Sequence, residues 1–236
     1  MTAVAGAIRE PVWSEVVLWF ETIDAIVRGL GHGLNNRALA LGATIESLDP
    51  KRPVGQQLAT GLMRETERLT DQLRQLRAVP FAIDREPMPL LLRDVLSSAI
   101  QLHRAHTSVG EIPVYLDGSV ETPPVLAPES ALLHATLVTL TALKVYASPG
   151  GVVRITCSGN ADRADVTFVA QRDPTDVQDE SGPRAVIKPA ALAVALLSSA
   201  MLEIEQQLGP DSVTLLWTLP SLKAMRRRAR EPAAAR

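Results

Sequence analysis

His32 is the residue whose type and surroundings are best suited to chemistry. A neutral imidazole is nucleophilic near pH 7, and the phosphoramidate that it forms passes a phosphoryl group readily to a carboxylate. Arg28 lies four residues before His32 and Asn36 lies four residues after it, so in a helix all three would share one side. The arginine could offset the charge of a phosphate, and the asparagine could hydrogen-bond a phosphoryl oxygen. This pattern makes His32 a candidate functional residue, and its chemistry would suit phosphoryl transfer.

The periodicity of residues 13–48 predicts one long helix that presents His32 to solvent. The segment contains no proline, and its apolar residues recur every three or four positions from Ile23 to Leu48. At about 100° per residue these side chains form a single stripe, and His32 lies on the opposite side of the helix. The alternative is an ordinary surface histidine.

Two features near His32 favour a docking surface over that alternative. Glycines destabilise a helix interior by roughly 1 kcal/mol each relative to alanine, so a cluster of them indicates that space is needed for a close approach. The glycines are Gly29, Gly31 and Gly33. An exposed apolar patch beside polar residues also marks an interaction site. The partner-binding residues that we predict are Arg28, Asn35, Leu39 and Ala43.

A second amphipathic segment, at about residues 55–77, follows a proline-containing break at residues 49–53. A short connection between two long helices makes them antiparallel neighbours. Each apolar stripe would keep one flank exposed, so we expect a second copy to complete a dimeric four-helix bundle. The alternative is that the hairpin packs on the rest of its own chain.

The remainder of the chain, from residue 80, predicts an α/β sandwich with helices on one face of a mixed sheet. Expected helices span about residues 89–107, 128–147 and 188–207, and expected strands span 112–117, 152–158, 164–170 and 212–219. The fold class is therefore α+β. We divide it into a helical hairpin domain at 1–79, an α/β domain at 80–222 and a basic flexible tail at 223–236.

Composition limits the partners and the cellular location. The net charge is −2 and the sequence pI is about 6.1, which gives no reason to expect a nucleic-acid partner. Cys157 is the only cysteine, so the chain cannot form an internal disulfide. No apolar run reaches the ~18 residues that a membrane span needs. We expect a cytoplasmic protein without a membrane partner. His103 and His106 lack nearby cysteines or acids, so no metal site is predicted.

The segment from His32 to Asn36 resembles the H-box of bacterial histidine kinases, where the phosphorylated histidine lies on the first helix of a dimerisation hairpin. Residues 127–132 resemble the start of the helix that carries the family's asparagine box. Residues 140–151 resemble that box and its exit, and residues 191–220 resemble the final helix and strand. The similarity covers roughly residues 20–220 in the family's order, and it implies the hairpin and ATPase-like domains of a histidine kinase.

Departures from the family pattern fall at its nucleotide-binding elements. The magnesium-coordinating asparagine would fall at Thr141 or Ala142, the glycines of the adenine pocket are missing from residues 169–179, and the lid region at 182–193 has one glycine and two prolines. A phosphate loop needs glycines so that its backbone amides can approach the phosphates. The acid that follows the histidine in kinases is Gly33 here. The resemblance therefore implies a degenerate ATPase domain.

Taken with these departures, the resemblance implies a histidine phosphotransferase of a two-component phosphorelay. His32 would take a phosphoryl group from an aspartate of one receiver domain and pass it to another, with Asn36 as the second catalytic residue. The receiver would supply Mg²⁺, so the chain would need no cofactor of its own. Two alternatives are a non-catalytic pseudokinase that docks receivers or kinases and an active kinase with divergent nucleotide-binding elements.

Overall fold

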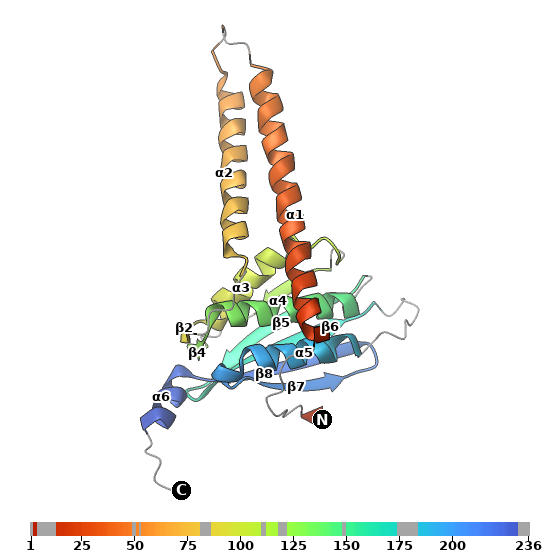
Figure 1. The fold of residues 1–236 in the computed structure, drawn as a ribbon, viewed down its shortest axis with the longest axis vertical. Coiled ribbons are helices and arrows are strands. Elements are labelled where there is room, and N and C mark those ends of the chain that lie inside the picture. Colours follow the sequence, from red (N-terminus) through yellow and green to blue (C-terminus); the bar gives the residue numbers. More distant parts are fainter. Residues whose placement is uncertain are drawn as a thin grey trace.

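The computed structural model describes residues 2–3, 13–48, 51, 53–80, 86–109, 112–117, 122–147, 150–173 and 184–230. A long helical hairpin projects from an α/β domain (Figure 1). The hairpin consists of α1 (Trp13–Glu46) and α2 (Gln56–Ala78), and it confirms the predicted pair of antiparallel helices. The upper part of α1 packs on α2, while its lower part lies against the helices of the α/β domain.

The α/β domain is built on a six-stranded mixed sheet with the strand order β1-β7-β8-β6-β5-β3. Only the β3–β5 pair is parallel, and the other neighbouring strands are antiparallel. The strands are β1 (Thr2–Ala3), β3 (Val114–Asp117), β5 (Val152–Gly159), β6 (Arg163–Gln171), β7 (Glu203–Leu208) and β8 (Ser212–Pro220). A separate two-stranded sheet pairs β2 (Met88–Leu90) with β4 (Val125–Ala127).

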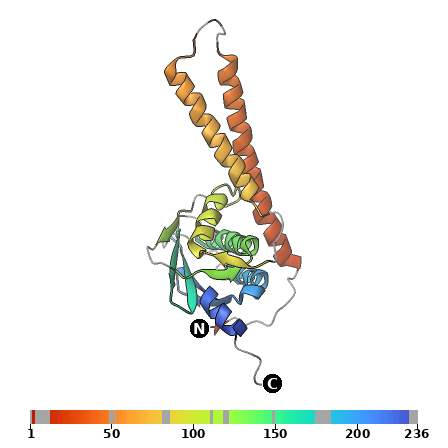
Figure 2. The same ribbon diagram turned by 90° about the vertical axis from the view of Figure 1, so that its left-hand side faces the viewer.

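Helices cover one face of the large sheet (Figure 2). They are α3 (Leu92–His103), α4 (Glu129–Ala147) and α5 (Arg184–Leu196). Burial alternates along β8, so one face of that strand points into the core and the other does not. The rings of Phe168 and Trp217, both fully buried, lie 4.9 Å apart in this core. The predicted α+β fold with helices on one sheet face is confirmed.

The apolar helix α4 lies at the centre of the domain. Among the described residues it alone is long and apolar enough to cross a membrane, but 89% of its apolar window is buried inside the protein. It packs against α3, α5 and the strands, and α1 crosses its outer side. Its composition is therefore that of a core helix.

Two sequence predictions about the C-terminal part are wrong. The helix expected at 188–207 ends at Leu196, and a short 3-10 helix, η1 (Ser198–Ala200), follows it. Met201 then adopts a left-handed backbone with φ of 54°, and Glu203–Leu208 pairs with β8 as β7. The basic tail expected to be flexible at 223–236 instead forms α6 (Leu222–Arg230). Ser221 Oγ accepts a hydrogen bond from Ala224 N–H at 3.1 Å, which caps the helix. Residues 231–236 lie outside the described residues.

Candidate functional site

His32 lies near the middle of α1 and is exposed, as its position on the helical wheel predicts. The chain has four histidines, and the other three are buried in the α/β domain. Burial lowers the pKa of His103 to about 3 and those of His106 and His134 to about 4. At neutral pH those imidazoles are uncharged parts of the core, so His32 alone presents an imidazole to a partner.

Asn36 hydrogen-bonds His32 directly. Its Nδ2 donates to His32 Nε2 across 3.0 Å, one helical turn away. An amide nitrogen can only donate, so Nε2 accepts and the imidazole carries its proton on Nδ1. In this tautomer the Nε2 lone pair accepts the hydrogen bond of Asn36, and it could act as a nucleophile only once that bond is released.

Arg28 lies one turn before His32 on the exposed side of α1, and its guanidinium pairs with Asp24 across 2.8 Å. The arginine and aspartate side chains are 74% and 56% exposed, so the ion pair is solvated and open to exchange for a phosphate. Leu39 is 64% exposed, and Asn35 and Ala43 are exposed too. All the predicted partner-binding residues are therefore accessible on α1. Asp24 is a further charged residue at this site, and its spacing of four residues from Arg28 is that of a helical ion pair, a signal that the sequence already contains.

The glycines around His32 serve the chain's own packing more than the sequence suggested. A Cβ on Gly29 would lie 1.7 Å from the backbone oxygen of Ala105, where α1 crosses the end of α3. A Cβ on Gly33 would lie 2.6 Å from the flexible amide of Gln72 on α2. Only Gly31 faces open space. The interpretation that all three clear space for a partner is therefore wrong for Gly29, whose close neighbour is backbone of its own chain.

A polar cluster on the adjoining side of the hairpin joins α1 to α2. Arg37 Nε donates to Gln72 Oε1, and its Nη1 donates to Glu65 Oε2, both across 3.0 Å. Hydrogen bonds from Arg68, and then from Arg37, lower the pKa of the Glu65 carboxyl. These bonds fix the register of the two helices just beyond His32. No local spacing predicts these partners of Arg37, because both lie on the other helix.

The segment of α4 that resembles the asparagine box lies beneath α1. Thr141 is 8% exposed, and its hydroxyl is 3.4 Å from the hydroxyl of Thr22 on α1. The same hydroxyl is 2.9 Å from His103 Nε2 and donates to the backbone oxygen of Leu137. The hydroxyl of this mostly buried threonine is therefore engaged in hydrogen bonds within the protein. The sequence located this position but not the helix that covers it.

Trp19 makes a second contact between α1 and α4. Its Nε1 donates to His134 Nε2 across 3.0 Å, and the two ring centroids are 4.3 Å apart. His134 is fully buried, as its position in an apolar helix predicts. The lower end of α1 is thus attached to the domain by specific polar contacts.

The structure describes part of the two other segments, 169–179 and 182–193, that stand where the family has nucleotide-binding elements. The described residues of the lid region form α5, which runs from Arg184 and contains Pro189 within its helix. Gly182 and residues 174–179 lie outside the described residues. His103 and His106 stack with an interplanar angle of 14°, an arrangement that does not direct both imidazoles to one ion. No group of three metal-ligating side chains occurs in the described part of the chain.

Comparison with known proteins gives similarity at the level of structure. No family model matches the sequence, and no curated protein matches it. A histidine kinase from Burkholderia phymatum has 16% identity and a TM-score of 0.47, with 89% of this chain and 98% of that chain covered. A structure described as a bacterial phosphotransferase has 13% identity and a TM-score of 0.46 over the same shares of the two chains.

A third similar structure is the histidine kinase ThkA in complex with the response regulator protein TrrA. Its identity is 12% and its TM-score is 0.46, and the match covers 82% of this chain and 60% of that chain. These structures are histidine kinases and a phosphotransferase, the class that the sequence resemblance named. At such TM-scores the similarity leaves the activity to be argued from this chain's own site.

Proposed function

We propose that this protein is a histidine phosphotransferase of a two-component phosphorelay. His32 accepts a phosphoryl group from a receiver domain's aspartyl phosphate and returns it to the aspartate of a second receiver. The observation that carries the proposal is an exposed imidazole whose Nε2 is oriented by Asn36 on a helix face with an exposed apolar side chain at Leu39.

The transfer step follows from the tautomer of His32. The Nε2 lone pair attacks phosphorus, the bond between phosphorus and the aspartyl oxygen breaks, and the carboxylate leaves with the bonding electrons. The proton on Nδ1 stays in place during the attack. Asn36 must release Nε2 for this step, and its amide is then free to donate to a phosphoryl oxygen. Arg28 can exchange Asp24 for the phosphoryl group and offset its charge.

The contacts of Thr141 with Thr22 and His103 support the proposal that phosphoryl transfer to His32 does not use ATP bound by this chain. A nucleotide site needs an accessible ligand for Mg²⁺ and glycine-rich backbone for the phosphates. The position that corresponds to the family's asparagine is a threonine enclosed by Thr22 and His103. We therefore propose that the phosphoryl group comes from a receiver, which also supplies Mg²⁺, and that the α/β domain is a degenerate ATPase domain.

The proposed partners are response-regulator receiver domains. ThkA, a structurally similar kinase, has been solved in complex with a response regulator. On this chain a mixed polar and apolar surface follows His32 along α1, next to the acceptor nitrogen. Its exposed residues are Asn35, Leu39 and Ala43. Such a surface suits a protein that must place an aspartyl phosphate against His32.

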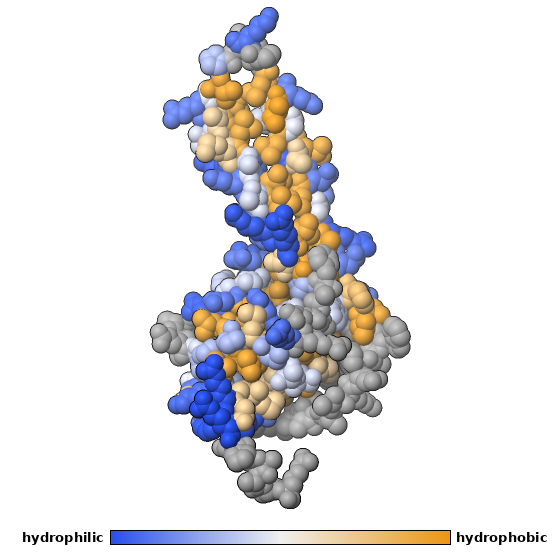
Figure 3. Space-filling view, turned by 60° about the vertical axis from the view of Figure 1, so that its left-hand side comes forward, coloured by the Kyte–Doolittle hydropathy of each residue, from blue (hydrophilic) through white to orange (hydrophobic). Residues whose placement is uncertain are grey.

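We also propose that the hairpin dimerises. None of the residues of α2 is buried, and large apolar side chains remain exposed along both helices. Figure 3 shows apolar residues running up the hairpin. Apart from Leu39, which lies on the His32 side of α1, the exposed large apolar residues of the two helices include Ile45, Leu58, Met63 and Leu73. A second copy packed on this surface would complete the four-helix bundle.

The test distinguishes phosphorylation of His32 from the docking of a receiver domain. Purified protein is mixed with a panel of receiver domains carrying labelled aspartyl phosphate, and in parallel with phosphoramidate as a small phosphoryl donor. We expect acid-labile label on His32 from both donors. The His32→Gln variant should lose the label from both, by a factor on the order of 100 or more. Leu39→Glu should lose transfer from receivers but keep labelling by phosphoramidate.

Other outcomes point to the alternatives. Label that persists in His32→Gln would exclude this histidine as the acceptor. Unlabelled but receiver-bound protein would indicate a non-catalytic pseudokinase. Micromolar binding of ATP by calorimetry, together with autophosphorylation, would indicate an active kinase.

A further inference from the structure

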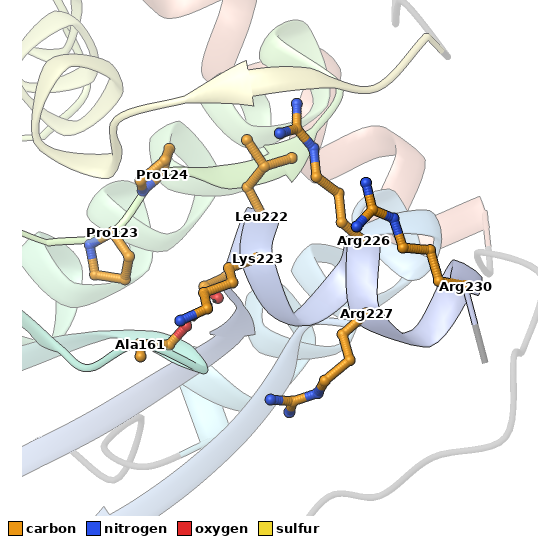
Figure 4. A pocket seen from close by; sticks show the side chains of 9 residues that line it. Pro123, Pro124, Ala161, Leu222, Lys223, Arg226, Arg227 and Arg230 are labelled. Carbon is orange, nitrogen blue, oxygen red and sulfur yellow. Dashed lines mark hydrogen bonds between the residues drawn. The ribbon is translucent and has the colours of Figure 1, made fainter.

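A groove with basic walls lies at the end of the α/β domain away from the hairpin tip (Figures 1 and 4). It has a volume of about 780 Å³ and is formed between α6, the segment that precedes β4 and the turn between β5 and β6. Its apolar surface includes Pro123, Pro124 and Leu222, and its charged residues are Lys223, Arg226, Arg227 and Arg230. The groove is separate from the His32 site.

The start of α6 is firmly attached on both sides of the groove. Leu222 N–H donates to Pro124 O across 2.7 Å, and Ser221 N–H donates to Asp162 O across 2.9 Å. Ser221 Oγ donates to Ala161 O across 2.6 Å. Prolines restrict the backbone of the opposite wall. The groove is therefore a preformed feature, and a ligand would not have to order it.

The cations have the spacing of one helical face. Lys223, Arg226, Arg227 and Arg230 are three, four and seven residues apart, so they form a continuous stripe on α6. Arg227 pairs with Asp162 across 3.0 Å. Within the described residues, no carboxylate forms an ion pair with Lys223, Arg226 or Arg230. Most of the positive charge of the stripe is thus available to a ligand.

We propose that this groove binds an acidic peptide segment of a partner protein. Arginines recognise carboxylates through paired N–H donors, and a row of them along a groove matches a row of acidic side chains on an extended chain. The proline and leucine surface would receive apolar side chains between the acidic ones. The chain's net charge of −2 shows that this positive surface is local. The positive charge is therefore concentrated at this groove, and an acidic segment would be attracted to this part of the protein.

A peptide fits the groove better than a membrane or a nucleic acid. A helix that binds lipid headgroups needs a free apolar face to insert, but Ala224 on α6 is 4% exposed and Leu222 and Met225 are half-buried against the domain. Among the residues that the structure describes, no aromatic side chain lines the groove to stack on a base.

The experiment measures binding of a short fluorescein-labelled peptide of Glu, Asp and Leu residues to the full chain by fluorescence anisotropy. We expect saturable binding that weakens with added salt. Lys223→Glu with Arg226→Glu should raise the Kd by on the order of tenfold or more. The charge-matched control is Arg64→Glu with Arg77→Glu on α2, where both arginines are exposed, and it should leave the Kd within about twofold.

Three results would overturn the proposal. The first is that the acidic peptide does not bind. The second is that the groove variant and its control lose affinity for the peptide equally, which would indicate only general charge attraction. The third is binding of phosphatidylglycerol vesicles through Lys223 and Arg226 while the peptide fails to compete, which would assign the surface to a membrane. These results do not depend on phosphorylation of His32, so the failure of either proposal leaves the other intact.

Discussion

The helical hairpin and the α/β domain treat their apolar residues in opposite ways. No residue of α2 is buried, whereas 16 of the 19 residues of α4 are buried. The hairpin exposes side chains as large as Leu39 and Met63, at 64% and 66%. The domain completes its core with its own strands and helices and with Ile23, Ile26 and Leu30 from the lower part of α1, whereas the upper part of the hairpin keeps large apolar side chains exposed. We infer that the contacts with a receiver and with a second copy would lie on the hairpin, apart from the groove proposed beside α6.

The histidines differ between the two regions in the same way. In the domain, His103, His106 and His134 are buried with lowered pKa values, and their rings contact other core side chains. In the hairpin, His32 is exposed and contacts only a neighbouring amide among the described residues. The same residue type is part of the packing in one region and a candidate nucleophile in the other, because only an exposed imidazole can be reached by a partner's phosphoryl group.

Low pH should destabilise the α/β domain because its buried histidines become protonated on unfolding. Their folded pKa values of about 3 to 4 lie below the ordinary 6.5, so between these limits the unfolded chain binds protons that the folded chain does not. Stability is therefore unaffected above pH 6.5 and falls as the pH is lowered. The expected loss is about 2 kcal/mol for each buried histidine between pH 6.5 and pH 5. Urea unfolding followed by tryptophan fluorescence measures it.

A variant isolates one of these histidines. His103→Gln keeps an amide near Thr141 but cannot titrate, so it should reduce the number of protons taken up on unfolding at pH 5 by about one. An unchanged pH dependence in this variant would mean that His103 does not carry a lowered pKa.

Charges on the exposed apolar surface should separate the proposed dimer. Leu58→Glu with Leu73→Glu removes apolar area from the hairpin and would place acids in the interface, since these side chains are 36% and 44% exposed in the single chain. Burying a leucine contributes about 1.5–3 kcal/mol, so the dimer dissociation constant should rise on the order of 100-fold or more. Light scattering coupled to size exclusion measures the mass.

The matched control carries the same change on the other face. Leu39→Glu lies on the His32 side of α1 and should leave the dimer intact while it weakens receiver docking. A monomeric wild-type chain, or equal dissociation in both variants, would contradict the proposed arrangement.

Substitutions at two glycines of α1 test where this helix packs against the α/β domain. Gly29→Ala places a methyl against the backbone oxygen of Ala105, so α1 must shift, and we expect a loss of about 1–3 kcal/mol. Gly31→Ala meets open space and should stabilise the helix by about 1 kcal/mol. Chemical unfolding of both variants measures the difference, and a stable Gly29→Ala protein would show that α1 is not held at this crossing.

Most elements of the fold could be predicted because their signals are local. The hairpin followed from apolar spacing and a proline break, and β5 and β6 followed from alternating residues around a turn. There Asn160 Oδ1 accepts hydrogen bonds from the backbone of Asp162 and Arg163. β7 was missed because its pairing with β8 overrides a sequence that also suits a helix. α6 was missed because a charged segment became a helix through a cap and a buried alanine.

The candidate site was predictable to a similar extent. Exposure of His32 and its proximity to Asn36 follow from helical geometry alone, since both lie on one face of one helix. The contacts of Thr141 with Thr22 and His103 join residues far apart in the chain, and no periodicity could reveal them. The same holds for the contact of Gly29 with Ala105.

The sequence by itself determined that His32 lies on the polar side of a long helix, since position on a helix depends only on spacing. It also determined the order of helices and strands over most of the α/β domain. Only the tertiary structure decided that α1 covers the segment around Thr141, that Gly29 serves a crossing within the chain, and that the basic C-terminal residues form one wall of a groove. The physical reason is that these features depend on contacts between distant segments, whose geometry is set when the core packs.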